Sequence, residues 1–273
     1  MVKAIVVGAG GRMGKRIIHT ILQTPGITLA GAVEKEGHPA VGRDVGELAG
    51  EGGVGVFVES DLDRVAGLGE VIVDFTIPEV SMKSLETAVR GRMALVIGTT
   101  GFSPDQVERI RAEGSRTRCV VAPNMSVGVN VMFKIVEEAA RALGPDYDVE
   151  IIEAHHRFKR DAPSGTAMKL GERIARALGR DLERVAVWGR KGMVGERKPA
   201  EIGIAAVRAG DIVGDHTVVF GGIGERLELT HRAHSRDNFA RGAVKAALWV
   251  VKQPEGLYDM QDVLGLRERR ERA

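Results

Sequence analysis

The stretch VVGAGGRMG, residues 6–14, decides the fold that we expect for the first part of the chain. It begins within an apolar run at 4–7 that is typical of a buried strand, and the following segment 12–24 places its apolar side chains on one helical face. A glycine-rich turn from a buried strand into a helix is typical of the first βα unit of a dinucleotide-binding sheet. We therefore expect a Rossmann-like domain at the start of the chain.

The glycines of this turn match the dinucleotide fingerprint in part. Gly8 permits the tight turn and Gly10 lets the backbone approach a pyrophosphate, while the start of the following helix offers N–H groups and a positive dipole end. The third glycine of the fingerprint falls at position 13, where this chain has Met13, and the next glycine is Gly14. The glycines alone are therefore weak evidence for a nucleotide site.

An acidic residue supports the same interpretation. Glu34 follows the second expected strand and lies twenty positions after Gly14, where an acid can accept hydrogen bonds from adenosine ribose hydroxyls. Lys35 comes next and, with help from Arg12, could instead pair with a 2′-phosphate, although both cations could equally be solvated. The sequence thus indicates NADH, NADPH or both, without choosing between them.

Strands and helices alternate through the first half of the chain. We expect strands at 27–33, 53–58, 71–76, 94–100 and 118–124, and helices at 78–90 and 103–112. This alternation predicts a parallel sheet that is covered on both faces. The segments GTTGF at 98–102 and APNMS at 122–126 would then lie at the carboxyl edge of the sheet, where ligands bind.

The pattern changes after about residue 126. We expect helices at 130–143, 165–179 and 236–253, and strands at 148–156, 202–210, 216–222 and 225–233. Consecutive strands with little helix between them predict an antiparallel or mixed sheet. The second half therefore favours a separate domain of α+β type.

Composition excludes several other classes of protein. Hydrophobic residues make up 44% of the 273 residues and the net charge is only +2, so we expect a globular protein with no strong field for nucleic acid or an anionic membrane. No apolar stretch approaches ~18 residues and the apolar start is too short for a signal peptide, so we expect a cytoplasmic protein.

Cys119 lies in an apolar run and is expected to be a buried thiol. The charged run 266–273 is expected to be a solvated, frayed helix end.

A second stretch, EAHHRFKRDAPSGTA at 153–167, concentrates proton carriers. A histidine has an unperturbed pKa of roughly 6.5, which suits proton transfer. His155 and His156 would point to opposite sides if the preceding strand continues through them. Lys159 supplies an ammonium that can donate a proton or hold a carboxylate.

The same stretch ends in residues that suit an anion. Ser164 is a natural N-cap for a helix that begins at Gly165. The N–H groups of Gly165 and Thr166 would face outward at that helix start, which is a site for a carboxylate. Asp161 could order the loop by pairing with a lysine or arginine.

Other interpretations of this stretch remain open. The histidine pair could bind a metal, although no cysteine and no further histidine at helical spacing completes a ligand set nearby. The side chains could be ordinary surface groups, or Ser164 could serve a hydrolase, although it lacks a nucleophile-elbow context. Beside a dinucleotide domain, the stretch favours a site that holds a reducible acid.

Taken together, these motifs resemble those of the bacterial dihydrodipicolinate reductase family. The matching segments are GAGGRMG, GTTGF, APNMSVGVN, EAHHRFKRDAPSGTA, VRAGDIVGDHTVVF and GERLELTHRAHSR. The resemblance runs from residue 4 to about residue 264, and 153–167 is its most specific part.

The resemblance implies roles for individual residues. It places a proton donor or acceptor on His155 and a catalytic lysine on Lys159, and it leaves open which of the two donates the proton. Substrate carboxylates would be held by His156, Gly165, Thr166 and Arg236. Cofactor contacts would come from Gly8, Ala9, Gly10, Gly11, Arg12, Met13, Glu34, Lys35, Gly98, Thr99, Thr100, Ala122, Pro123, Asn124 and Met125, and no metal is implied. Family members often carry arginine where this chain has Lys35, and lysine lacks the guanidinium fork, so a preference for NADPH stays open.

The resemblance also implies an architecture and an activity. Residues 1–126 and 237–273 would form the dinucleotide-binding domain, and residues 127–236 a substrate domain whose mixed sheet makes the contacts of a homotetramer. The activity would be NADH- or NADPH-dependent reduction of 4-hydroxy-tetrahydrodipicolinate (dihydrodipicolinate), a small dicarboxylate, to tetrahydrodipicolinate on the diaminopimelate route to lysine. A non-catalytic NAD(P)-sensing regulator on the same fold is the alternative, but it would not need the proton carriers of 153–166. A semialdehyde dehydrogenase-like enzyme would need a reactive cysteine, and Cys119 is badly placed for one.

Overall fold

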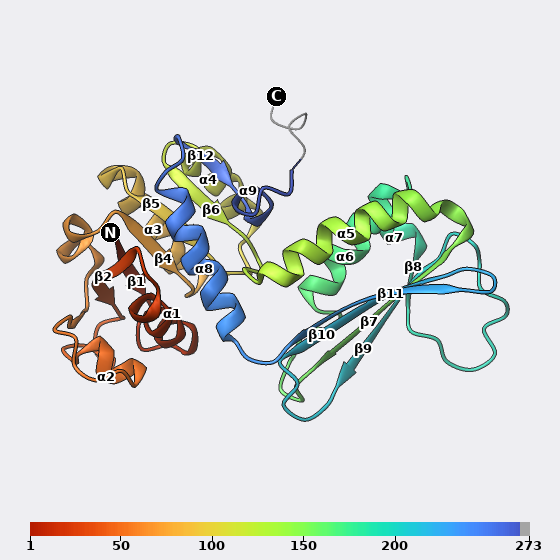
Figure 1. Ribbon diagram of the computed structural model, residues 1–273, viewed down its shortest axis with the longest axis horizontal. Helices are drawn as coiled ribbons and strands as arrows, with labels where there is room; N and C mark the ends of the chain where they lie inside the picture. The colour runs from red at the N-terminus through yellow and green to blue at the C-terminus, as the bar shows by residue number, and fades with distance from the viewer. Residues whose placement is uncertain (268–273) are drawn as a thin grey trace. The chain divides into compact units, whose positions relative to one another are not determined.

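The computed structural model describes residues 1–267 and falls into two compact units (Figure 1). The first unit comprises residues 1–127 and the chain from residue 236 onward, and the second comprises residues 128–235. Each boundary lies one residue from the domains expected from the sequence. Arg236, expected in the substrate domain, groups with the first unit. The charged run expected to be a frayed helix end lies, from residue 268 on, outside the described residues.

The first unit is built on a parallel sheet. Its strands lie in the order β12-β6-β5-β4-β1-β2-β3, and every neighbouring pair is parallel. The elements are β1 (Val2–Val7), α1 (Arg12–Gln23), β2 (Ile27–Val33), α2 (Val45–Ala49), β3 (Val58–Glu59), β4 (Val71–Asp74), α3 (Pro78–Gly91), β5 (Ala94–Ile97), α4 (Pro104–Gly114), β6 (Arg118–Val121), α8 (Asp237–Val250), β12 (Gly256–Tyr258) and α9 (Met260–Val263), with short 3-10 turns at Leu62–Arg64 and Ala66–Leu68. This confirms the Rossmann-like sheet.

Both faces of the sheet are covered because its central strands are apolar on both sides. Val6, Val73 and Val96 lie side by side in the strand register and pack in one core with the buried face of α1 and with α8. The alternate residues, such as Ile5 and Ile72, pack in a second core with α3. Short runs buried on both faces are what a parallel sheet requires.

The expected strand at 53–58 is largely wrong. Only Val58 and Glu59 form β3, because the preceding segment is rich in glycine and its N–H groups have another partner. The carboxylate of Asp44 accepts from the N–H groups of Gly46, Val54 and Gly55. The segment is therefore a loop closed on one aspartate.

The second unit is a mixed sheet covered by helices. Its elements are α5 (Val127–Leu143), a 3-10 turn (Gly144–Asp146), β7 (Asp148–His155), α6 (Gly165–Ala177), α7 (Leu182–Val185), β8 (Ala186–Trp188), β9 (Ile202–Arg208), β10 (Gly214–Gly221) and β11 (Arg226–Ala233). The strands lie in the order β11-β10-β7-β9-β8. β10 is antiparallel to both β7 and β11, whereas β9 is parallel to both β7 and β8. The expected α+β unit with a mixed sheet is confirmed.

The core of the second unit lies between the sheet and its helices. Figure 1 shows α5 and α6 on the same side of the sheet. Val136 of α5 and Leu170 and Ile174 of α6 pack in one cluster with Ile151 of β7 and Val218 of β10. The face of β7 that carries these residues also carries Glu153, so the strand brings a carboxylate to the edge of this core.

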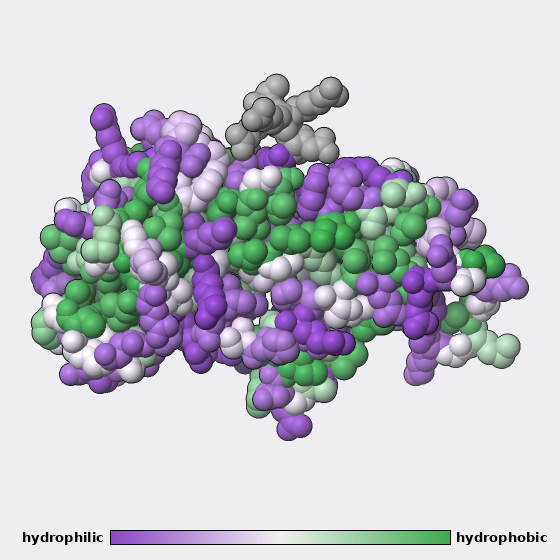
Figure 2. All heavy atoms as spheres, viewed as in Figure 1, coloured by the Kyte–Doolittle hydropathy of each residue, from purple (hydrophilic) through white to green (hydrophobic). Residues whose placement is uncertain are grey.

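No helix within residues 1–267 is long and apolar enough to cross a bilayer. Figure 2 shows hydrophilic residues scattered among hydrophobic ones over the face in view.

Candidate active site

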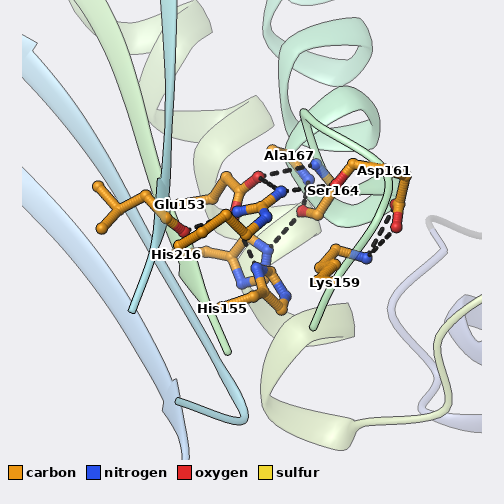
Figure 3. Close-up of polar contacts among 9 residues, drawn as sticks. Glu153, His155, Lys159, Asp161, Ser164, Ala167 and His216 are labelled. Carbon is orange, nitrogen blue, oxygen red and sulfur yellow. Dashed lines mark hydrogen bonds and ion pairs between the residues drawn. The ribbon is translucent and has the colours of Figure 1, made fainter. Parts of the chain in front are cut away.

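A carboxylate on β7 lies at the centre of the candidate site in the second unit (Figure 3). Glu153 and His155 are two residues apart on the strand, so their side chains leave the same face. β9 runs parallel beside β7 and places Arg208 opposite His155. The fully buried Glu153 lies 2.6 Å from His155 Nδ1 and accepts a hydrogen bond of 2.8 Å from each terminal nitrogen of Arg208. Strand pairing thus assembles a histidine, a carboxylate and a guanidinium.

The contacts decide where the protons lie. Burial raises the pKa of Glu153, but the hydrogen bonds from Arg208 and His155 outweigh burial and hold that pKa below its ordinary value. The ionised carboxylate can only accept, so His155 Nδ1 carries the shared proton. His155 Nε2 is then the nitrogen left for chemistry. It lies beside Gly214, where an added Cβ would come within 3.0 Å of it.

A second histidine packs against the first. The ring of His216, from β10, meets the ring of His155 edge-on, with centroids 5.2 Å apart. Burial lowers the pKa of His216 to about 3, so this ring is neutral. Burial also lowers the pKa of His155, although Glu153 opposes that effect. His216 Nε2 lies 2.9 Å from Ser164 Oγ, which joins the strand cluster to the next helix.

Ser164 fixes the start of α6, as the sequence predicted. Its Oγ accepts a hydrogen bond of 3.1 Å from the N–H of Ala167, and its own N–H donates to Glu153 at 3.0 Å. The first N–H groups of a helix have no partner inside the helix. A Cβ at Gly165 would meet nothing within 4 Å, so an anion can approach this helix start. A carboxylate site at Gly165 and Thr166 stays a prediction.

Lys159 lies on the loop between β7 and α6. Its ammonium is 2.9 and 2.8 Å from the two carboxylate oxygens of Asp161, as the sequence predicted for this aspartate. Lys159 holds the pKa of Asp161 below its ordinary value. Figure 3 shows Lys159 turned toward Asp161 and away from His155.

His156 differs from its neighbour. β7 ends at His155, so His156 lies just beyond the strand. Among the residues that the structure describes, the buried Nδ1 of His156 has no hydrogen-bond partner. Within the described part of the chain, nothing therefore fixes Nδ1 of His156, in contrast to Nδ1 of His155.

The glycine turn of the first unit is closed against β2. Gly8 has a φ of 79°, and the N–H groups of Gly8 and Ala9 both donate to the carbonyl of Val33, at 2.8 and 3.0 Å. A Cβ at Gly14 would lie 2.0 Å from the carbonyl oxygen of Gly8. Gly14 therefore allows the close packing of helix on strand that the fingerprint assigns to its third glycine. Met13, at the expected position, is not required to be small.

Glu34 lies directly beside this turn. Its carboxylate accepts from the N–H of Gly10 at 3.0 Å and from the N–H of Lys35 at 2.9 Å. A carboxylate has about four acceptor positions, so two bonds leave capacity for ribose hydroxyls. The side chains of Arg12 and Lys35 are exposed. The narrow glycine turn and the adjacent acid fit a dinucleotide.

The loops after β5 and β6 also lie at the carboxyl edge. A Cβ at Gly98 would come within 2.2 Å of the Phe75 ring. The buried Thr99 hydroxyl accepts hydrogen bonds from the N–H of Thr76 and from Ser81 Oγ, so its side chain points into the protein. Thr100 is exposed. Thr99 could therefore reach a cofactor only through its backbone.

The segment after β6 also has both buried and accessible side chains. The side chains of Ala122 and Met125 are buried in the first core, whereas Pro123 is exposed and Asn124 half-buried. Asn124 Oδ1 accepts from the N–H of Ser126 at 2.9 Å. Their expected cofactor contacts stay predictions.

The structure thus arranges the expected residues in two clusters, one in each unit. The second unit brings together His155, Lys159 and the helix start at Gly165, while Arg236 is the N-cap residue of α8. Sequence reasoning missed three members of the cluster around His155, namely Glu153, Arg208 and His216. Glu153 carried a signal, because a polar residue two positions before His155 shares its face of a strand.

Two other chemistries find no support. In residues 1–267 no group of three or more His, Cys, Asp and Glu side chains could hold a metal ion. Cys119 is fully buried, and burial raises the pKa of its thiol to about 12, so it is not a reactive thiolate. The expectation of a structural cysteine is confirmed.

Family models match nearly the whole chain. The model for the N-terminus of dihydrodipicolinate reductase matches residues 2–125, and the model for its C-terminus matches residues 128–264. The 4-hydroxy-tetrahydrodipicolinate reductase of Syntrophus aciditrophicus (strain SB) is 59% identical over 267 residues, which cover 98% of this chain and 100% of the relative. The reductase of the same name from Geotalea uraniireducens (strain Rf4) is 54% identical with the same coverage.

Solved structures agree with these matches. A dipicolinate-bound dihydrodipicolinate reductase from Paenisporosarcina sp. TG-14 aligns with a TM-score of 0.75 and 26% identity, covering 96% of this chain and 98% of that one. An amine dehydrogenase from Mycobacterium smegmatis, at 15% identity and a TM-score of 0.61 over 98% of this chain and 97% of that one, shares the fold alone. The sequence motifs, both family models and the curated relatives therefore agree that this chain belongs to the dihydrodipicolinate reductase family of oxidoreductases.

Proposed function

We propose that this chain reduces 4-hydroxy-tetrahydrodipicolinate, which loses one water before the hydride arrives, to tetrahydrodipicolinate with NADH or NADPH, on the diaminopimelate route to lysine. The observation that carries the proposal is the cluster around Glu153. It joins a proton-carrying histidine, with one ring nitrogen left for chemistry, to a helix start that suits a carboxylate. The substrate is a dicarboxylate that must gain a proton when it is reduced, so it needs both features.

The first unit would hold the cofactor, which when bound supplies a hydride. The pyrophosphate would lie against the turn from Gly8 to Met13 and the start of α1. Glu34 would accept hydrogen bonds from the adenosine ribose. The nicotinamide end would lie against backbone and side chains of residues 98–100 and 122–125.

The second unit would orient the substrate and supply the proton. Gly165 and Thr166 would hold one carboxylate through backbone N–H groups, and His156 would hold the other. Arg236, which groups with the first unit, would be a further basic contact of the substrate. Electrons move toward the ring nitrogen as hydride arrives, so an acid must protonate the product. His155, as an imidazolium, through Nε2, or Lys159 through its ammonium, would do this.

The choice of cofactor depends on Lys35 and Arg12. Both side chains are exposed, and either the ammonium or the guanidinium could pair with a 2′-phosphate. The carboxylate of Glu34 favours an unphosphorylated ribose instead. We therefore expect activity with both cofactors. We also expect the protein to act in the cytoplasm.

A homotetramer would form through the open face of the mixed sheet. Ile152 of β7 and Val207 of β9 lie on the face away from α5 and α6, and each is 44% exposed. Apolar side chains at the middle of an uncovered sheet face are typical of an interface. The tetramer would cover this face.

One assay tests the function. The purified full chain is mixed with freshly prepared substrate, and the loss of reduced-nicotinamide absorbance is followed with NADH and with NADPH separately. Substrate-dependent oxidation of either cofactor is the expected result. Tight cofactor binding without any turnover would contradict the proposal and would favour a NAD(P)-sensing regulator.

A further inference from the structure

The carboxylate of Glu153 contacts both halves of the candidate site at once. Its Oε2 lies 2.6 Å from His155 Nδ1, and its Oε1 accepts the N–H of Ser164 at 3.0 Å. Arg208 spans the two oxygens, with 2.8 Å to each. One side chain therefore fixes the distance between the proton carrier and the start of α6.

Arg208 extends this arrangement to the loop that carries Lys159. One of its terminal nitrogens donates to the carbonyl of Asp161 at 2.7 Å, in addition to Glu153. Taking the fully buried carboxylate of Glu153 out of water is costly, so the pair contributes little net stability. Its contacts with three functional segments, namely the end of β7, the loop and the start of α6, point to a role other than stability.

A comparable ion pair in the same unit lacks these contacts. Glu137 of α5 is also buried and accepts a hydrogen bond of 3.0 Å from Arg173 of α6. It pairs further with Arg141 and Arg176 on the helices. It joins helix to helix, and its side-chain partners within residues 1–267 are arginines and not histidines, so it serves as a matched control.

We infer that Glu153 is a positioning residue for the reaction, which rests on the proposed function. It holds His155 with the proton on Nδ1, so that Nε2 faces the reacting partner. Through Ser164 it also keeps the anion-binding helix start at a set distance from that nitrogen. The carboxylate stays ionised throughout and exchanges no proton, because Arg208 neutralises it.

Replacing the carboxylate by an amide separates these effects. In Glu153→Gln a single carbonyl oxygen remains for Arg208, Ser164 and His155, so His155 loses its fixed acceptor. The imidazolium also loses its neighbouring negative charge, while the positive charges of Arg208 and Lys159 and the neutral ring of His216 still face it. The pKa of His155 must then fall.

Nitrogen NMR of histidine-labelled protein gives a readout that does not need turnover. The His155 signals are assigned as those missing from His155→Ala. In the wild type we expect neutral His155 to carry its proton on Nδ1. In Glu153→Gln we expect a mixture of tautomers and a lower pKa of His155, while Glu137→Gln leaves both unchanged. A wild-type His155 protonated on Nε2, or a tautomer and pKa that are the same in Glu153→Gln as in the wild type, would overturn the inference.

Steady-state kinetics then test whether the position of His155 affects the rate of reduction. We expect kcat of Glu153→Gln to fall at least about tenfold, as for other groups that orient a catalytic side chain. Glu137→Gln should stay within about twofold, although both variants lose an arginine-paired carboxylate. Equal kcat losses in the two variants would contradict positioning.

Failure of the inference differs from failure of the function. A wild type that oxidises neither cofactor with substrate contradicts the proposed reductase, and the NMR comparison still tests the position of the His155 proton. If Glu153→Gln does not fold, the wild-type tautomer alone decides.

Discussion

His155 is subject to two opposing influences. Burial lowers its pKa, and the neighbouring carboxylate of Glu153 favours the charged ring. Burial outweighs the carboxylate, so the pKa of the ring lies below its ordinary value. Lys159, by contrast, is paired with the carboxylate of Asp161.

Removing either proton carrier should slow turnover. We expect His155→Ala and Lys159→Ala to lower kcat by at least about 10²-fold, the lower range for general acid catalysis. Steady-state rates with saturating cofactor measure this. Full turnover in both variants would count against the roles assigned to these residues.

Glu34 should discriminate between the two cofactors. Glu34→Ala removes the acceptor for the adenosine ribose hydroxyls. NADH has both hydroxyls, whereas in NADPH one of them carries a phosphate. The affinity for NADH should therefore fall more than the affinity for NADPH. Dissociation constants measured by titration test this. Equal losses with both cofactors would remove the ribose assignment.

His216 should make the protein sensitive to acid. Its pKa is about 3 when folded, against an ordinary 6.5, so the unfolded chain binds the proton more strongly and stability falls as the pH drops below the ordinary value. For one such group the loss is about 2 kcal/mol between about pH 8 and pH 5. His216→Gln keeps a donor for Ser164 Oγ and should lose less stability over this range in denaturant titrations. An identical pH dependence in both proteins would show that the histidine is not buried neutral.

At the scale of elements, the first turn of α1 depends on one glycine. A Cβ added at Gly14 would overlap the carbonyl of Gly8, so the helix can approach β1 only if this position has no side chain. The sequence fingerprint predicted a glycine one position earlier. In the structure, the position that must lack a side chain is the one on the face of α1 that packs against β1, which is Gly14.

Gly14→Ala should therefore displace α1. We expect a loss of about 1–3 kcal/mol in the free energy of unfolding, as for other overpacked sites, and weaker binding of both NADH and NADPH. Gly67→Ala is the control, because a Cβ at Gly67 would meet nothing within 4 Å. Thermal melts and cofactor titrations of the two variants give the comparison, and equal behaviour would refute the close packing.

At the scale of the whole molecule, we propose that the open sheet face of the second unit is the assembly interface. Ile152→Lys places a charge in the middle of the face that we propose as the interface, so the tetramer should dissociate into smaller species. Light scattering after size-exclusion chromatography measures the mass. Ile135→Lys on α5 alters an isoleucine that is 45% exposed, about as much as Ile152, and should leave the mass unchanged. A wild type that is already monomeric would contradict the proposed tetramer.

Local pattern was enough for much of the fold. The helical repeat of Ile17, Ile18 and Ile21 predicted the buried face of α1, and the side chain of Ser164 caps the helix that it was expected to begin. Such signals are readable because they depend on residues within one or two turns of each other.

Features that depend on distant partners were not readable. The loop at 53–58 has some apolar residues of a strand, but Asp44 takes its N–H groups. The short strand β12 exists only because β6 lies beside it. The strand and helix periods of roughly two and 3.6 residues depend on neighbouring residues only, so they carry no information about Asp44 or β6.

The sequence by itself determined the alternation of strands and helices, the glycine turn with its acidic neighbour, and the run of proton carriers at 153–167. Only the tertiary structure decided that Glu153, Arg208 and His216 surround His155, because they lie on β7, β9 and β10 and meet through strand pairing. The physical reason is that a buried carboxylate must find a cation and hydrogen-bond donors wherever the folded chain supplies them. Those donors come from segments far apart in the sequence, so no local motif announces them.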